Sequence, residues 1–370
     1  MRVLRQLTCR QVGLPVSWGC AFMNKQIAWP SAERQAHFER WLASLTARHG
    51  IQRDTLEPAS ADASFRRYLR VQGTGRSLIV MDAPPPLEDV RPFVHVAGLV
   101  HAAGLTAPRV LEADVELGFL LLDDLGSQVY LQALQAATPA EADALMRDAL
   151  TALLRFQQAV PSATLPPFDE KLLGAELDLF PTWCVQRECG VTWSAAEQQQ
   201  WDRVRRLLIN SALAQPVVAV HADWMPRNLM VTGDATRNPG ILDFQDAVAG
   251  PITYDLASLL RDAFLSWDEP QEIDWAVRWW QQARQAGLPV DADFGEFWRA
   301  LEWMGLQRHL KVMGIFCRLK HRDGKDKYAA DLPRFFDYAN KVAMRYRPLG
   351  PLLKLLEPLS GTRVEAGFTF

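Results

Sequence analysis

Apolar residues recur at helical spacing in the first part of the chain that has a clear pattern. A helix is predicted there between Ser31, which can cap its start, and Gly50, which can end it. Its apolar positions follow the i, i+3, i+4, i+7 spacing of one helix face: Phe38, Trp41, Leu42 and Leu45. The pattern indicates a helix with one buried side.

After Gly50 the apolar runs become short and are separated by turn residues, which is typical of strands. A hairpin turn is expected at residues 73–75, and three consecutive prolines at residues 84–86 end this unit. A helix is predicted over residues 88–103. The predicted strands are residues 51–56, 65–71, 77–81, 109–113 and 118–122. The first of these has the weakest strand pattern.

Helical patterns dominate after residue 126. Two capping boxes, Thr138 with Glu141 and Ser194 with Glu197, mark the starts of helices. Two short apolar runs interrupt the helices, and each ends in polar residues: residues 217–220 and 241–244. The chain is therefore predicted to be an α+β protein, with a small β-rich part before a larger helical part.

The composition narrows the function by exclusion. The 370 residues suffice for two domains or lobes, and 49% hydrophobic and 22% charged residues are ordinary globular values. Lys and Arg number 40 against 43 Asp and Glu, and the net charge of −3 argues against a dedicated nucleic-acid or anionic-membrane binder. Five cysteines without a CxxC pair favour a reduced, cytoplasmic protein over a disulfide framework or a zinc ribbon.

The N-terminal segment has three arginines and then a mildly apolar stretch, as a secretion signal would. Glycine, proline and serine interrupt that stretch, however, and no small-residue cleavage site follows it. Met23 offers a simpler explanation, in which it is the natural start and residues 1–22 are a non-structural extension. No window approaches the roughly 18 uninterrupted apolar residues of a membrane span.

The candidate chemistry is concentrated in residues 221–255. His221, Asp223 and Asn228 have the spacing H-x-D-x-x-x-x-N of a kinase catalytic loop. Asp243 follows a short apolar run, at the place where kinases have the aspartate of D-F-G. Asp and Asn are common in turns, so either half alone would mean little. The joint pattern predicts a phosphotransferase site.

Phosphoryl transfer explains why these residue types have this spacing. One carboxylate must orient the acceptor hydroxyl and take its proton, while a second carboxylate and an amide oxygen must hold Mg²⁺, which prefers hard oxygen ligands. The loop between Asp223 and Asn228 lets one face the acceptor and the other the metal, and Asp243 approaches from the next strand. His221 is expected to hold the loop by hydrogen bonds.

This region resembles the aminoglycoside phosphotransferase family of protein-kinase-like small-molecule kinases. The resemblance rests on three stretches: residues 221–228, 243–246 and 250–257. It implies a two-lobed protein-kinase-like fold, with an N-lobe over residues 23–126, a helical C-lobe over residues 127–370, and ATP in the cleft. By position it makes Asp223 the catalytic base, and Asn228 and Asp243 the Mg²⁺ ligands.

The nucleotide contacts implied by the resemblance involve two N-lobe segments. A loop with Ser60 and Ser64 replaces the glycine-rich loop, and its small residues and hydroxyls still let backbone N–H groups approach phosphate. The strand that ends near residue 122 resembles a kinase hinge, which suggests the Asp123 carbonyl and the Leu125 N–H as adenine partners. A plain polar turn explains either segment as well.

The phosphate-binding lysine of kinases is missing, because Met81 stands where it is expected. The replacement candidates are three arginines of the preceding strand: Arg66, Arg67 and Arg70. Alternation along a strand places Arg67 on one face and the other two on the opposite face. Arg67 is the favoured candidate, and a solvated strand face is the alternative for all three.

A narrower resemblance concerns the acceptor. Four stretches look like the bacterial anomeric N-acetylmuramate/N-acetylglucosamine kinases of peptidoglycan recycling: residues 64–68, 81–85, 243–247 and 307–312. Trp224 is expected as a sugar-stacking wall, and Asp246 as an acceptor from a sugar hydroxyl or a second metal contact. A substrate carboxylate, such as a lactyl group, could meet one of three cations in residues 308–318: Arg308, Lys311 or Arg318.

Two alternatives remain open. One is a kinase for another small hydroxyl acceptor, such as an aminoglycoside, a choline-like alcohol or homoserine. The other is a nucleotide-binding pseudokinase, which the missing lysine favours and the intact Asp223, Asn228 and Asp243 oppose. The expected partner is a small molecule rather than a nucleic acid or a membrane, and the oligomeric state stays undetermined.

Overall fold

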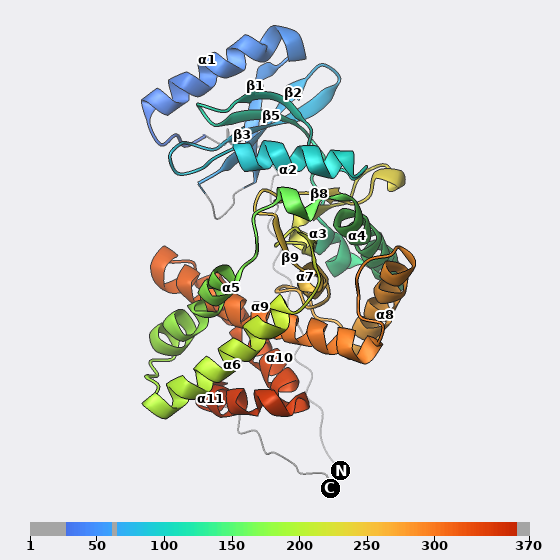
Figure 1. Cartoon of the computed structure of the whole chain (residues 1–370). Helices are drawn as coiled ribbons and strands as arrows, with labels where there is room; N and C mark the ends of the chain where they lie inside the picture. The colour runs from blue at the N-terminus through green and yellow to red at the C-terminus, as the bar shows by residue number, and fades with distance from the viewer. Residues whose placement is uncertain (1–26, 61–64, 361–370) are drawn as a thin grey trace, which may run out of the picture.

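The computed structural model describes residues 27–60 and 65–360, which form two lobes (Figure 1). The expected N-terminal extension, residues 1–22, lies outside the described residues. A five-stranded antiparallel sheet of order β1-β2-β3-β5-β4 forms the N-terminal lobe. Its strands are β1 (Gln52–Ser60), β2 (Arg67–Gly73), β3 (Arg76–Asp82), β4 (Val110–Asp114) and β5 (Phe119–Asp123).

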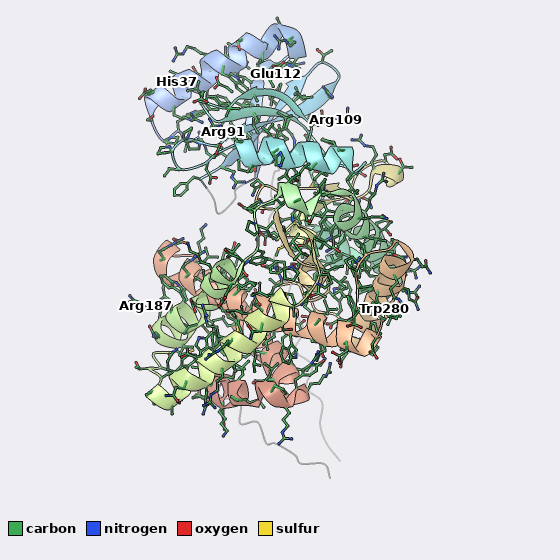
Figure 2. The ribbon with its side chains drawn as sticks, in the orientation of Figure 1. His37, Arg91, Arg109, Glu112, Arg187 and Trp280 are labelled. Carbon is green, nitrogen blue, oxygen red and sulfur yellow. The ribbon has the colours of Figure 1, made fainter. Side chains whose placement is uncertain are left out.

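Two helices cover opposite faces of this sheet: α1 (Ala32–His49) and α2 (Arg91–Ala102). Phe38 and Leu42 of α1 pack on Leu69 and Val80, whereas α2 shares the other core with Met81. Glu112 on the edge strand β4 also accepts hydrogen bonds from the end of α1, from Arg48 at 2.5 Å and His49 at 2.8 Å (Figure 2). Successive residues of a strand therefore point alternately toward α1 and toward the helical lobe.

The C-terminal lobe is mostly helical, and its core is continuous with the α2 face of the sheet. Its central helix is α9 (Phe294–Asp323), which packs against α7 (Tyr254–Leu260), α10 (Leu332–Arg345) and a π-helical segment, η2 (Phe180–Glu188). The other helices are α3 (Tyr130–Ala136), α4 (Pro139–Ala159), α5 (Glu170–Leu177), α6 (Ala195–Leu213), α7 (Tyr254–Leu260), α8 (Glu269–Gln285), α10 (Leu332–Arg345) and α11 (Gly350–Ser360).

Two short antiparallel strand pairs hold the loops that contain the candidate chemistry. β6 (Val217–Val220) pairs with β9 (Val248–Pro251), and β7 (Leu229–Met230) pairs with β8 (Gly240–Ile241). Residues 221–228 therefore leave β6 and enter β7, and residues 242–247 connect β8 to β9. These pairings bring the two loops to the same place although they are distant in sequence.

Most predicted elements are confirmed. Ser31 caps α1, both capping boxes form, and the hairpin turn lies between β2 and β3. The helix predicted from residue 88 begins at Arg91. The short apolar run at residues 241–244 pairs as a strand only at Ile241, where β8 ends, and Asp243 adopts a left-handed conformation with φ of 60°. The lobe boundary expected at residue 126 falls between β5 and α3. In the described part of the chain, no helix is long and apolar enough to cross a bilayer.

Candidate active site

The backbone just after β6 is fixed by hydrogen bonds from buried side chains. The Asp255 carboxylate, at the start of α7, accepts from the N–H of His221 at 2.6 Å and of Ala222 at 3.1 Å. Ala222 has φ of 76°, in the left-handed region that L-residues with a Cβ rarely adopt. Arg308 on α9 donates to the Ala222 carbonyl at 3.1 Å. Both peptide groups around Ala222 are therefore held, and they set the direction of Asp223.

Asp255 is completely buried, and this burial raises its pKa to about 7. The two backbone N–H donors and the positive charge of Arg308 favour the ionised carboxylate instead. Only the carboxylate form offers an acceptor oxygen to each N–H without presenting a proton to either. The strained loop is thus stabilised by a charge that the surrounding protein would otherwise exclude.

His221 connects the two loops. Its Nε2–H donates to the Leu242 carbonyl at 3.0 Å, and its Nδ1 accepts from the Asp223 N–H at 3.3 Å. Burial lowers the pKa of His221 to about 4, so the imidazole is neutral near pH 7 and keeps this tautomer. The sequence-based expectation that His221 holds the loop agrees with these contacts.

Asn228 lies between the two acidic residues of the motif. Its amide N–H donates to the Asp223 carbonyl at 2.9 Å, and its Nδ2 lies 3.5 Å from Oδ2 of Asp243. Gln245, which the sequence analysis overlooked, donates to Asp243 at 2.9 Å and to Asp246 at 3.0 Å. One amide group therefore holds two carboxylates close together that would otherwise repel each other. The position of Gln245, two residues after Asp243, is the sequence signal that could have indicated this role.

A cavity of about 280 Å³ opens between the sheet and the helical lobe, beside these loops. Asn228 and Asp243 line this cavity. Residues 123–126, which leave the sheet after β5, also line it. Its apolar walls come from both lobes and suit a flat ring: Ala59, Ile79, Phe93, Leu122, Val129, Met230 and Leu242. The cavity thus joins an apolar slot to a polar, oxygen-rich end.

The structure brings some of the expected nucleotide contacts together. Asp123 and Leu125 line the cavity, as a hinge would. Ser60 ends β1, with its backbone paired to Tyr68, which also lines the cavity. Ser64 lies outside the described residues.

Arg67 lies on the opposite face of the sheet from the cavity, against the sequence-based expectation. It pairs with the buried Asp82, donates to the Ala28 carbonyl, and its guanidinium carbon lies 4.4 Å from the ring centroid of Trp29. Arg34 of α1 pairs with the same Asp82 at 2.5 Å. The prediction that Arg67 points away from Arg66 and Arg70 is confirmed, but the choice of its face for the nucleotide is wrong. The packing of α1 covers that face of β2, and the sequence pattern does not show this.

Arg70 and Arg66 belong to the other face of that strand. Arg70 lines the cavity and is held by Asp124 at 2.6 Å, next to the expected hinge. Arg66 donates to Glu88 at 2.8 Å, and both side chains are largely buried. Burial opposes the charge on Arg66, but Glu88 and the nearby Asp246 raise its pKa above the ordinary value. Arg66 thus carries a positive charge held by Glu88 and within electrostatic range of Asp246, although it does not itself line the cavity.

Trp224 does not reach any surface. It is 0% exposed and packs on Phe156, with ring centroids 5.8 Å apart, and on His221 at 5.4 Å. A sugar therefore cannot stack on it in this conformation, and the expected wall is instead a core residue under the catalytic-type loop. Met81, where a lysine was expected, is also fully buried.

The donor set suits Mg²⁺ better than a transition metal. No group of three or more His, Cys, Asp or Glu side chains in residues 27–60 and 65–360 is arranged to hold a metal ion. Asn228 and Asp243 instead offer one amide and one carboxylate, the sparse hard-oxygen set with which Mg²⁺ keeps waters and binds phosphate oxygens. Oε1 of Gln245 is buried beside them without a hydrogen-bond partner.

Comparison with known proteins gives consistent matches. A family model described as "Phosphotransferase enzyme family" matches residues 55–298. The chain is 52% identical over 305 residues to an N-acetylmuramate/N-acetylglucosamine kinase of Pseudomonas putida, covering 82% of this chain and 88% of that protein. A kinase of the same name from Neisseria meningitidis is 45% identical over 341 residues, covering 91% and 100%.

Solved structures share the fold at low identity. A choline/ethanolamine kinase family protein of Mesorhizobium loti matches with a TM-score of 0.56 and 17% identity, covering 89% of this chain and all of that one. Spectinomycin phosphotransferase, in complex with ADP and spectinomycin, matches with a TM-score of 0.54 and 13% identity, covering 86% and 98%. The likeness to these kinase structures confirms the predicted protein-kinase-like fold.

Asp255→Asn tests the support of the loop. The amide keeps the size of the side chain but turns an NH₂ group toward one of the two backbone N–H donors, so one charge-assisted hydrogen bond is lost. We expect the free energy of unfolding to fall by about 1.5–3 kcal/mol in urea denaturation at neutral pH.

The control is Asp293→Asn at the start of α9, where an exposed carboxylate also accepts from two backbone N–H groups. Asparagine caps helices about as well as aspartate, so the change there should stay within about 0.5 kcal/mol. Equal losses of unfolding free energy in the two variants would show that burial does not strengthen the hydrogen bonds of Asp255.

Proposed function

Because the chain belongs to the phosphotransferase enzyme family, we propose that it transfers the γ-phosphoryl group of ATP to the C1 hydroxyl of N-acetylmuramate and N-acetylglucosamine. The identity of 45–52% to kinases of that name, over most of both chains, supports the acceptor. The observation that carries the activity is the hydrogen-bonded connection of Asp223, Asn228 and Asp243 beside the cavity.

Asp223 is proposed to orient the acceptor and to take its proton. As the C1 oxygen bonds to the γ-phosphorus, the bond from that phosphorus to ADP breaks and the hydroxyl proton passes to the Asp223 carboxylate. The products are the sugar phosphate, ADP and a proton. Bonds to the backbone on both sides of Asp223 support this role, since a proton acceptor must be held in register with the hydroxyl.

Asn228 and Asp243 are proposed to hold Mg²⁺, which neutralises part of the phosphate charge when bound. Gln245 keeps Asp243 in place and ties it to Asp246. For the base, the apolar walls of the cavity suit adenine, and the Asp123 carbonyl and the Leu125 N–H are the proposed partners of its edge.

Arg66 is proposed to replace the missing lysine. In protein kinases, a lysine on the third strand pairs with a glutamate of the adjacent helix and contacts the phosphates. Here Glu88, just before α2, pairs with Arg66, whose charge lies within electrostatic range of Asp246. An arginine can meet two phosphate oxygens at once, so the exchange keeps the function with a different geometry.

Turnover on an acceptor panel tests the proposed function. The purified protein with ATP and Mg²⁺ should release ADP with N-acetylmuramate and N-acetylglucosamine, and not with an aminoglycoside, choline or homoserine. Asp223→Asn should lower kcat by about 100-fold or more, because the proton acceptor is lost, while ADP binding by calorimetry stays within about threefold. Turnover only with a non-sugar acceptor would contradict the substrate, and ADP binding without any turnover would indicate a pseudokinase.

Arginine variants test the phosphate contact. Arg66→Ala should raise the KM for ATP by roughly 10- to 150-fold, the effect of losing one charge-assisted hydrogen bond. The matched control is Arg67→Ala, which should lower the melting temperature, because Asp82 loses one of two partners, and leave the KM for ATP nearly unchanged. If Arg67→Ala impairs ATP use and Arg66→Ala does not, the cation has been assigned to the wrong face.

A further inference from the structure

A second polar cluster lies in the helical lobe next to the catalytic-type loop. Lys311 of α9 donates to Glu176 of α5 at 2.5 Å and to the hydroxyl of Tyr254 of α7 at 2.9 Å. The Tyr254 hydroxyl also lies 3.3 Å from Glu176. Three helices therefore meet at one lysine, and none of these three residues lines the cavity described above.

Arg308 connects this cluster to the residue before Asp223. The guanidinium of Arg308 lies 4.6 Å from the Tyr254 ring centroid, and the same group donates to the Ala222 carbonyl, one residue before Asp223. Burial lowers the pKa of Lys311, but Glu176 and Tyr254, and then Asp223, outweigh burial and hold the pKa above its ordinary value. Lys311 is therefore a permanent cation within electrostatic range of the proposed base.

Solvent reaches this cluster at Lys311 and Glu176. Tyr254 is fully buried and Arg308 is 5% exposed, whereas the side chains of Lys311 and Glu176 keep 17% and 12% of their exposure. An ammonium group has three N–H donors, of which the contacts with Glu176 and Tyr254 use two. One N–H donor of the partly exposed Lys311 thus remains for a ligand.

The two sugars in the name of the related kinases differ in one charge. N-acetylmuramate carries a lactyl ether with a carboxylate on O3, where N-acetylglucosamine has a hydroxyl. An acceptor with its C1 hydroxyl at Asp223 also needs a place for this carboxylate near the same loop. Arg308 holds the residue before Asp223 and is faced by the Asp255 carboxylate, and Lys311 lies within electrostatic range of Asp223 and is paired with Glu176.

We propose that Lys311 binds the lactyl carboxylate of N-acetylmuramate, with Glu176 balancing its charge when N-acetylglucosamine is the substrate. This proposal rests on the proposed function. Glu176 keeps the lysine paired in the absence of the lactyl group, so the uncharged sugar does not leave a bare buried cation. The same Glu176 repels the lactyl carboxylate, which limits the preference for N-acetylmuramate.

Arg318, the third cation of this helix considered for a carboxylate, does not belong to the cluster. Its electrostatic neighbours are Arg322 and Asp323, near the end of α9. Lys320 is likewise separate, because it pairs with Glu188 at 2.7 Å. These residues offer a control on the same helix.

Steady-state kinetics with both sugars test the proposal. Lys311→Met should lower kcat/KM for N-acetylmuramate by roughly 10- to 150-fold, mainly through KM, and change kcat/KM for N-acetylglucosamine less than about threefold. Glu176→Gln should shift the ratio of the two kcat/KM values in favour of N-acetylmuramate. Lys320→Met should alter neither sugar.

N-acetylmuramate with an amide in place of its lactyl carboxylate tests the proposal on the wild-type enzyme. The wild-type kcat/KM for this amide should be lower than for the acid by about the same factor that Lys311→Met causes with the acid. In Lys311→Met, the kcat/KM values for the acid and the amide should be nearly equal. Equal losses for both sugars in Lys311→Met, or full activity of the wild type on the amide, would overturn the proposal. No turnover of either sugar by the wild type would instead refute the proposed function.

Discussion

The buried carboxylate of Asp255 is the constraint on which the candidate site depends. It binds two successive backbone N–H groups and holds Ala222 in a conformation that is unfavourable for an alanine. Arg308 then holds the carbonyl of the same residue, and the imidazole of His221 holds the next N–H. Side chains from α7 and α9 therefore fix the backbone before Asp223, and His221 and Asn228 of the loop hold the backbone of Asp223 itself.

Hydrogen bonds from two residues of this loop also connect it to the loop that contains Asp243. His221 and Asn228 connect the loop after β6 to the loop after β8, so Asp223 and Asp243 are held relative to each other by neutral donors. Gln245 extends this to Asp246, and Asp246 lies within electrostatic range of Arg66 of the sheet lobe. Amide groups therefore hold the acidic residues close together, and a nearby guanidinium offsets part of their negative charge.

The sequence predicted the parts of this account that depend on local pattern. The capping boxes, the hairpin and the spacing of Asp223, Asn228 and Asp243 are local, so they could be recognised without tertiary information. The direction in which a side chain points could not be. Arg67 and Trp224 were placed in the site by position, yet one faces α1 and the other is in the core, because packing partners distant in sequence decide which face is open. Gln245 and Glu88 gain their roles only through contacts with Asp246 and Arg66.

The position of the transferred phosphate distinguishes phosphorylation at C1 from phosphorylation at another hydroxyl. We expect N-acetylglucosamine, incubated with the enzyme, ATP and Mg²⁺, to give a product in which ³¹P–¹³C coupling appears at C1 and C2 of the sugar. Coupling at C5 and C6 instead would place the phosphate on the C6 hydroxyl. That result would contradict an enzyme that holds the anomeric hydroxyl at Asp223.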